Sequence, residues 1–301
     1  MTFSMKILLT GGSGQLGKEI LKSKPRGIEI INPSSAQLDL SDYLSCMKTV
    51  LDSKPDWIIN CAAYTKVDEA EKNIKLSNQV NSFAPAAFTE AINKMDTKLL
   101  HISTDFVFDG NQNFPYEESQ TRNPLSQYGT SKALGEELIE KKIHDIEKVT
   151  ILRTSWVISP RGKNFVLTML KLHSEKDYID VVSDQIGSPT STYDLAKVCW
   201  KIIEVKRKEK LPHILHWSDS GVASWYDIAI AVGDLAEDLK IIEKKAIVNP
   251  ISTFEYPTPA KRPRYSILNT SNTSKVLNIR PNYWRDNLRK ILIEYQKKGT
   301  I

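Results

Sequence analysis

The feature that most constrains the fold of this chain is the regular alternation of short apolar runs with longer amphipathic ones. Five runs rich in β-branched and other large apolar residues have the pattern of buried strands, at 6–10, 28–31, 57–60, 98–103 and 149–153. Helical patterns lie between them, from Leu16 to Leu21 and at about 41–52, 80–94 and 127–143. Strands that alternate with helices predict a parallel sheet covered on both faces. Because crossover connections are right-handed, we expect an α/β fold with a Rossmann-type, doubly wound parallel sheet.

Beyond Ser155 the alternation is looser. We predict a sixth strand at 181–182 and a helix at about 192–205, and from Leu211 onward the pattern is irregular and rich in proline. This half predicts a smaller, interleaved α/β lobe rather than a domain joined by a linker. The expected division is a Rossmann domain at 1–155, to which part of 180–212 returns, and a lobe formed mainly by 156–301.

The composition fits a globular protein without covalent cross-links. Of 301 residues, 41% are hydrophobic and 26% charged, and the three cysteines have no metal-ligand spacing. The net charge of +5 is spread along the chain, which argues against nucleic-acid binding but suits an anionic substrate such as a nucleotide. No run of 18 apolar residues predicts a membrane span, and residues 1–4 are too short and too weakly charged for a signal peptide. We therefore expect a cytoplasmic protein.

Gly11, Gly14 and Gly17 directly follow the first strand and open a helix. The spacing alone fits an ordinary turn equally well, but in this context it predicts a dinucleotide-binding loop. Glycines permit a tight turn and a close backbone approach, and the helix N-terminus attracts pyrophosphate. After the second strand, residues 32–35 offer neither an acid for a ribose hydroxyl nor an arginine for a 2′-phosphate. We therefore expect a slight preference for NADPH, with NADH also accepted.

Tyr128 and Lys132 are four residues apart in a predicted helix, so they share one face. A nearby ammonium favours the phenolate, and we expect it to lower the pKa of Tyr128 toward neutral pH. Such a pair is common by chance, and a solvated lysine explains the pair alone more simply. Thr104, however, ends the preceding strand at the edge where parallel sheets bind ligands, which indicates a site for carbonyl reduction. The long segment 109–126 is expected to cover this site.

Taken in order, these features resemble the extended short-chain dehydrogenase/reductases, and among them the dTDP-4-dehydrorhamnose reductases. The resemblance spans nearly the whole chain and is carried by the stretches 10–17, 60–68, 103–110, 128–132, 153–157, 164–165, 184–190 and 256–263. The last three lie in the second half and discriminate better than the Rossmann motifs do. The chain departs from the family pattern at Tyr64, where His is frequent, and at Phe106, where Tyr is frequent.

The resemblance implies NADPH-dependent reduction of the C4 ketone of dTDP-4-dehydro-β-L-rhamnose to dTDP-L-rhamnose, the last step of dTDP-rhamnose biosynthesis. Tyr128 would donate the proton to O4, Lys132 would bind the nicotinamide ribose and tune the pKa of Tyr128, and Thr104 would hydrogen-bond the carbonyl. Coenzyme contacts are implied for Gly11, Gly14, Gln15, Leu16, Gly17, Asp39, Leu40, Ala62, Ala63, Tyr64, Thr65, Tyr128 and Lys132. Contacts with the dTDP-sugar, mainly from the second lobe, are implied for Thr104, Asp105, Trp156, Asn164, Phe165 and Arg262. Arg262 lies beside prolines and could equally brace its own loop.

Two other functions fit the same residues. One is a reductase or reductase–epimerase acting on another nucleoside-diphosphate 4-keto sugar. The other is a non-catalytic subunit resembling the regulatory β-subunit of methionine adenosyltransferase, although an intact Thr104, Tyr128 and Lys132 argues against it. Some relatives form metal-bridged dimers, but no such ligands can be matched, so we predict no metal site and leave a homodimer open. The histidines have no ligand spacing and are expected to be structural or exposed: His101, His144, His173, His213 and His216.

Overall fold

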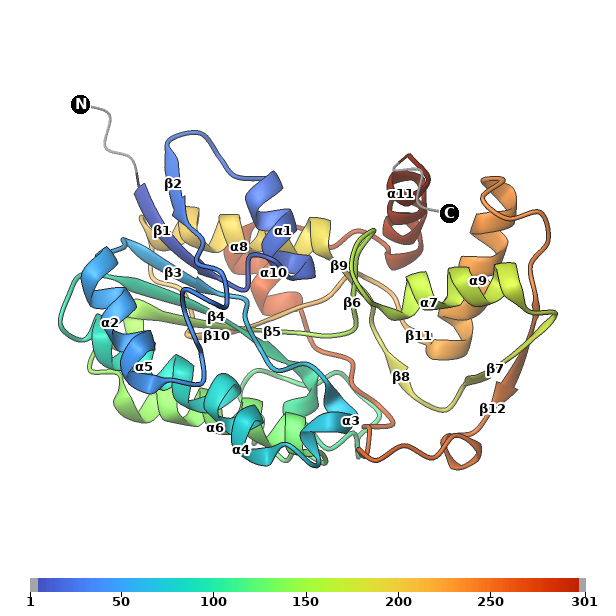
Figure 1. Ribbon diagram of the computed structural model, residues 1–301, viewed down its shortest axis with the longest axis horizontal. Helices are drawn as coiled ribbons and strands as arrows, with labels where there is room; N and C mark the ends of the chain where they lie inside the picture. Colours follow the sequence, from blue (N-terminus) through green and yellow to red (C-terminus); the bar gives the residue numbers. More distant parts are fainter. Residues whose placement is uncertain (1–4, 298–301) are drawn as a thin grey trace.

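The computed structural model describes residues 5–297 and is built around a six-stranded parallel sheet (Figure 1). The strand order is β10-β5-β4-β3-β1-β2. The strands are β1 (Met5–Thr10), β2 (Ile28–Ile31), β3 (Trp57–Asn60), β4 (Lys98–Thr104), β5 (Val149–Thr154) and β10 (Ile214–Trp217). The first five lie where the sequence predicts them, and the Rossmann-type parallel sheet is confirmed.

Helices cover both faces of this sheet (Figure 1). One face carries α1 (Gln15–Lys22), α8 (Thr192–Lys206) and α10 (Ser271–Leu277), and the other carries α2 (Tyr43–Ser53), α5 (Ala84–Ile92) and α6 (Gln127–Lys142). Successive residues of a strand point to opposite faces, so Leu8 and Leu9 of β1 enter different apolar clusters. The continuous apolar runs of the strands are thus explained by burial on both sides.

The predicted position of the sixth strand is wrong. Residues 181–182 belong to β7 (Tyr178–Val182), which pairs with β12 (Ile247–Ile251) in the second lobe. The sixth strand of the main sheet is β10, which lies within the stretch predicted to be irregular and pairs in parallel with β5. Four residues just after Pro212 give a weak local signal. The pairing with β5, about sixty residues away in sequence, decides the structure instead.

The second lobe is also more regular than its proline content predicts. Its helices are α7 (Phe165–Glu175), α9 (Trp225–Asp238) and α11 (Trp284–Gln296), and its short strand pairs are β6 (Val157–Ile158) with β9 (Thr190–Ser191) and β8 (Ile186–Gly187) with β11 (Ala223–Ser224). The three helices, β6 and β11 share one apolar cluster with β7 and β12. Ser224 and Asp227 form a capping box that starts α9. Three elements beyond residue 155, namely α8, β10 and α10, pack in the layers of the main sheet. The division of the chain at residue 155 stays a prediction.

Short elements connect the larger ones. Between β3 and α5 lie α3 (Val67–Ala70), α4 (Ile74–Asn78) and the π-helical turn η1 (Gln79–Phe83), and the 3-10 turns are η2 (Asp105–Val107), η3 (Ile146–Lys148) and η4 (Thr253–Glu255). Across residues 5–297, none of the helices combines the length and the apolar character that crossing a membrane requires. The segment 1–4, predicted not to be a signal peptide, falls outside the described residues.

Gly135 lets α6 approach the π-helical turn closely. A Cβ atom at this position would lie 2.2 Å from the backbone oxygen of Asn81, which is far inside van der Waals contact. Because α6 also carries Tyr128 and Lys132, this approach fixes the height of both side chains above the sheet.

We expect Gly135→Ala to lower the free energy of unfolding by about 2 kcal/mol, the usual scale of overpacking. The sign is diagnostic, because alanine inside an unhindered helix would raise stability by up to about 1 kcal/mol. Urea denaturation measures the effect, with Thr130→Ala on the exposed side of the same helix as the control. A Gly135→Ala protein as stable as the wild type would contradict the close contact.

Candidate active site

The glycine loop lies at the point where the strand order of the sheet reverses. β1 is followed in sequence by its neighbour on one side, β2, and then by its neighbour on the other side, β3. Gly11 has a φ of +71°, and a Cβ there would lie 2.6 Å from the backbone nitrogen of Ala62. A Cβ at Gly17 would lie 2.2 Å from the Gly11 oxygen. Both positions therefore require glycine, for backbone conformation at Gly11 and for close approach at both.

The N-terminus of α1 is free to bind an anion. Its N-cap, Gly14, contributes no side chain, and the first turn carries no acidic residue. The initial N–H groups of a helix lack intrahelical acceptors and carry the positive end of the helix dipole. The loop and this helix start thus fit the pyrophosphate of a dinucleotide.

Two predicted ligand-binding segments meet at this loop. The Asn164 side-chain nitrogen donates to Gln15 Oε1 at 2.9 Å, while Asn164 Oδ1 caps α7 by accepting from the Leu167 N–H. Leu16 and Gly17 are buried beneath the loop. A residue expected to contact coenzyme and one expected to contact substrate are therefore in direct contact, and the second lobe is attached to the coenzyme loop.

Asp39, which was predicted to lie on the adenine side of the coenzyme, makes hydrogen bonds within its own turn. Asp39 is exposed, and its carboxylate accepts from the N–H and the hydroxyl of Ser41, which lowers its pKa. Leu40 is partly buried. The Asn32 side chain lies directly against Gly12, where a Cβ would be 2.0 Å from Asn32 Oδ1. Residues 32–35 carry no charge, as the sequence analysis noted, and coenzyme contacts at Asp39 and Leu40 stay a prediction.

The segment after β3 is clamped by a residue that the sequence analysis missed. Asn81 Oδ1 accepts from the backbone N–H of Tyr64 at 2.7 Å. Asn81 Nδ2 donates to the backbone carbonyl oxygen of Tyr64 at 3.1 Å and to Ser131 Oγ at 2.9 Å. Asn81 thereby joins the strip of Ala62, Ala63, Tyr64 and Thr65 to α6. It lies in a π-helical turn, a feature often found near functional sites but not visible in the sequence.

The three predicted catalytic residues come together at the carboxyl end of β4. Thr104 is its last residue, and α6 begins beside it with Ser126 as the N-cap. The Tyr128 hydroxyl lies close enough to the Thr104 hydroxyl for that group to lower its pKa. The Tyr128 ring lies edge-on against Phe106, with centroids 5.6 Å apart. Lys132, one turn further along α6, is 1% exposed.

The expected lowering of the Tyr128 pKa is wrong in direction. Burial raises the pKa of Tyr128 to about 12, with a smaller contribution from the Asp105 carboxylate and an opposing one from the Thr104 hydroxyl. The reason is that the Lys132 ammonium turns into the sheet, where it donates to the Ile102 oxygen at 2.7 Å. Burial lowers the pKa of Lys132 itself to about 8.

Asp105 directly follows Thr104 in the chain and begins the 3-10 turn η2. Its Oδ1 accepts from the Thr104 hydroxyl at 3.0 Å. Burial raises its pKa to about 6, and the nearby hydroxyls of Ser266 and Thr104 oppose that rise. A buried carboxyl poised in this way can accept from a ligand hydroxyl when ionised, or donate to one when protonated.

Trp156 forms a stacked aromatic pair with Trp225, which the sequence analysis did not identify. The ring centroids are 3.7 Å apart and the planes differ by 7°, while Phe165 packs on Trp225 at 4.7 Å. Trp156 has a φ of +44°, a strained conformation for a bulky residue. Trp225 is held in turn, because its Nε1 donates to Gln185 Oε1 at 3.1 Å. The predicted substrate residues Trp156 and Phe165 thus belong to one aromatic cluster.

Arg262 braces its loop, the alternative that the sequence analysis left open. Its guanidinium donates to both carboxylate oxygens of Asp68, at 3.2 and 2.7 Å, and also to the Thr258 hydroxyl and the Ala260 oxygen. The pairing with Arg262 lowers the pKa of Asp68. Arg262 therefore ties the second lobe to α3, and a contact with the nucleotide stays a prediction.

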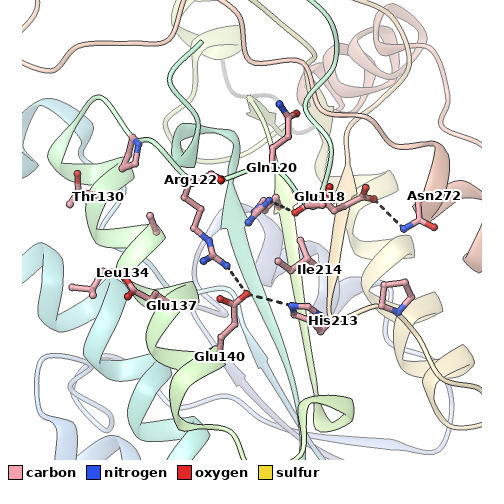
Figure 2. A pocket seen from close by; sticks show the side chains of 16 residues that line it. Glu118, Gln120, Arg122, Thr130, Leu134, Glu137, Glu140, His213, Ile214 and Asn272 are labelled. Atoms are coloured by element: carbon pink, nitrogen blue, oxygen red, sulfur yellow. Dashed lines mark hydrogen bonds and ion pairs between the residues drawn. The ribbon is translucent and has the colours of Figure 1, made fainter. Parts of the chain in front are cut away.

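The segment 109–126 is fastened to α6 and borders a pocket on the far side of that helix. Figure 2 shows this pocket, where Glu140 lies between Arg122, which donates to it at 2.6 Å, and His213, at 3.4 Å. Thr130, Leu134 and Glu137 line it from α6, whereas Thr104, Tyr128 and Lys132 do not. Throughout the part of the chain that the structure describes, no His, Cys, Asp and Glu side chains gather in a group of three or more that could hold a metal ion.

Comparison with known proteins agrees with this geometry. The family model of the RmlD substrate binding domain matches residues 5–297. The dTDP-4-dehydrorhamnose reductase of Aggregatibacter actinomycetemcomitans is 38% identical over 290 residues, covering 95% of this chain and 98% of the relative. The spore coat polysaccharide biosynthesis protein SpsK of Bacillus subtilis (strain 168) is also 38% identical, covering 96% of this chain and 97% of SpsK.

The solved structures extend the likeness to three dimensions. The dTDP-4-dehydrorhamnose reductase of Bacillus anthracis str. Ames, in complex with NADP, matches with a TM-score of 0.88 and 34% identity, covering 97% of this chain and 99% of that one. Sequence and fold thus agree over nearly the full length. The chain therefore belongs to the RmlD substrate binding domain family, the family of the dTDP-sugar 4-keto reductases.

Proposed function

We propose that the protein reduces the C4 ketone of dTDP-4-dehydro-β-L-rhamnose with NADPH and releases dTDP-L-rhamnose, as the last step of dTDP-rhamnose biosynthesis in the cytoplasm. The observation that carries this proposal is that Tyr128, at the start of α6, lies close enough to Thr104, at the end of β4, for the Thr104 hydroxyl to lower its pKa, with Lys132 one turn further along the same helix. The name of the relative from Aggregatibacter actinomycetemcomitans supports the choice of sugar.

The proposed chemistry assigns one task to each residue. NADPH, when bound, supplies the hydride that C4 receives. Tyr128 donates its phenolic proton to O4 as negative charge develops there, and a pKa of about 12 means that the phenol carries this proton at neutral pH. The Thr104 hydroxyl, which donates to Asp105 in the structure, turns to donate a second hydrogen bond to O4 when the sugar is bound. Lys132 binds the nicotinamide ribose and leaves the phenol protonated until the hydride arrives.

NADPH is the proposed coenzyme because residues 32–35, which follow β2, carry no carboxylate that would repel a 2′-phosphate. The uncharged stretch 32–35 lies beside the glycine loop, and Asn32 touches Gly12. The relative from Bacillus anthracis str. Ames was solved in complex with NADP. Within the same proposal, Trp156 gives the sugar a flat surface, and Asp105 binds one of its hydroxyls.

A different nucleoside-diphosphate 4-keto sugar is the second candidate substrate. SpsK, as close in sequence as the first relative, has a name that specifies spore coat polysaccharide biosynthesis and no sugar. One extra contact in a pocket can change substrate choice, so a panel of nucleotide 4-keto sugars distinguishes the two reductases. A purely regulatory subunit would bind its partner and turn over none of the panel.

We expect Tyr128→Phe to lower kcat by at least about 10²-fold, because general acid catalysis is lost. NADPH affinity should be nearly unchanged, since the ring stays in place. Turnover is followed as NADPH oxidation with the 4-keto sugar generated in situ, and product stereochemistry is determined on the wild-type reaction. A variant that keeps more than about a tenth of wild-type turnover would exclude Tyr128 as the acid.

Both coenzymes should support turnover, with a modest preference for NADPH in kcat/KM. A carboxylate at the ribose would repel the 2′-phosphate, and residues 32–35 supply none. Introducing one as Ser34→Asp should reverse the preference, and Ser34→Asn is the uncharged control. A strong wild-type preference for NADH would show that an acid reaches the ribose from elsewhere.

Coenzyme capture should weaken at alkaline pH. Lys132 contributes as the ammonium, and burial lowers its pKa to about 8, so its charged fraction falls as the pH rises through that value. We expect kcat/KM for NADPH, which reports the free enzyme, to fall about tenfold per pH unit above the pKa. Lys132→Met should give a low and nearly flat profile. A wild-type profile that stays level up to about pH 10 would mean an ordinary lysine pKa.

A further inference from the structure

A row of buried polar side chains crosses the sheet beneath Lys132. The strand register places Thr10 of β1 opposite Asn60 of β3, and Asn60 opposite His101 of β4. Their exposed fractions are 1%, 1% and 0%. The neighbouring residues Leu8, Ile58 and Leu99 of the same strands are entirely apolar and buried. Polar side chains at such a depth are costly unless they are hydrogen-bonded, so the row needs an explanation beyond packing.

Hydrogen bonds join the row and end at the Lys132 ammonium. Thr10 Oγ1 and Asn60 Oδ1 are 2.6 Å apart, and Asn60 Nδ2 lies 2.9 Å from His101 Nδ1. His101 Nε2 lies 3.2 Å from Lys132 Nζ. Both ring nitrogens of His101 are therefore engaged, and the ring cannot turn without breaking two contacts.

When the His101 imidazole is neutral, each contact along the row pairs a hydrogen-bond donor with an acceptor. Burial and the Lys132 charge hold the pKa of His101 well below its usual range. A neutral ring that accepts from Lys132 at Nε2 carries its proton on Nδ1, which then donates to the Asn60 side chain. The two ends of the Asn60 amide are interchangeable in this geometry, so its oxygen can face His101 and its nitrogen can face Thr10.

This arrangement leaves one N–H of Lys132 for a ligand. An ammonium has three donors, and the structure gives Lys132 two acceptors, the Ile102 oxygen and His101 Nε2. The other titratable groups that influence Lys132 are Glu136 on its own helix and Cys61 after β3. Glu136 is bound to Arg153, so it does not replace His101 as an acceptor.

We propose that His101, fixed by Asn60 and Thr10, is a positioning residue that holds the Lys132 ammonium by one of its hydrogens and directs another toward the ribose hydroxyls of the coenzyme. The proposal rests on the function proposed above only in taking NADPH as the ligand of Lys132. It assigns His101 no contact with coenzyme or sugar.

The test measures NADPH affinity by fluorescence titration, without any sugar, as a function of pH. His101→Phe removes the acceptor, and we expect binding at neutral pH to weaken about tenfold, as for one hydrogen bond to a charged group. The alkaline loss of binding should also move to lower pH, because the ammonium loses an acceptor. His101→Gln keeps an acceptor and should recover most of the affinity and the wild-type pH dependence. His101→Leu serves in the same comparison if His101→Phe does not fold.

A double-mutant cycle separates positioning from a general effect on the fold. If His101 acts through Lys132, then His101→Phe should change NADPH affinity little in a Lys132→Met background. His173→Leu removes a buried imidazole in the second lobe and should leave NADPH affinity at the wild-type value. The inference is overturned if His101→Phe binds NADPH as the wild type does, or if its effect persists in full without the Lys132 charge. A wild type that binds NADPH but reduces none of the sugars would refute the proposed function and leave this inference standing.

Discussion

Three parts of the site are held together by the buried carboxylate of Glu136, one turn beyond Lys132 on α6. It accepts from Ser103 on β4, from the Arg153 guanidinium on β5 at 2.7 Å, and from Arg122 in the segment 109–126 at 2.6 Å. Burial alone would raise its pKa, but Arg153 and Arg122 outweigh burial and lower it to about 2. A buried ion pair adds little net stability, whereas removing one partner costs about 3–5 kcal/mol. Its main consequence is geometric, because it fixes α6 against the strand that ends at Thr104.

Backbone contacts set the same geometry from the other side. Gly135 brings α6 against the π-helical turn, and Asn81 from that turn binds the backbone of Tyr64. Gly129 has the same effect one helical turn from Lys132, where a Cβ would lie 2.3 Å from the Phe106 oxygen. The helix α6 is therefore fixed by main-chain approach at two glycines and by charge at Glu136. Rigid support of this kind places a donor to within the tolerance that proton transfer requires.

The sequence predicted the parts of the site that have local signals. Gly11 and Gly17 follow a strand and open a helix, and Tyr128 and Lys132 share a helical face, so both groups could be located without a structure. Asn81, His101 and Trp225 could not, because their partners lie 17, 31 and 69 positions away in sequence. β10 was missed for the same reason. The direction of the Tyr128 pKa was wrong because spacing shows that two side chains share a face but does not show that the ammonium turns into the sheet.

The glycine loop and α3 are each linked to the second lobe by a contact between distant segments. Gln15 beside the glycine loop meets Asn164 at the start of α7, and Asp68 on α3 meets Arg262. α7 also begins with Phe165, which packs on Trp225 behind Trp156. A pyrophosphate bound at the start of α1 would therefore lie beside Gln15. The Asn164 side chain that contacts Gln15 also caps α7, the helix that begins with Phe165 of the aromatic cluster.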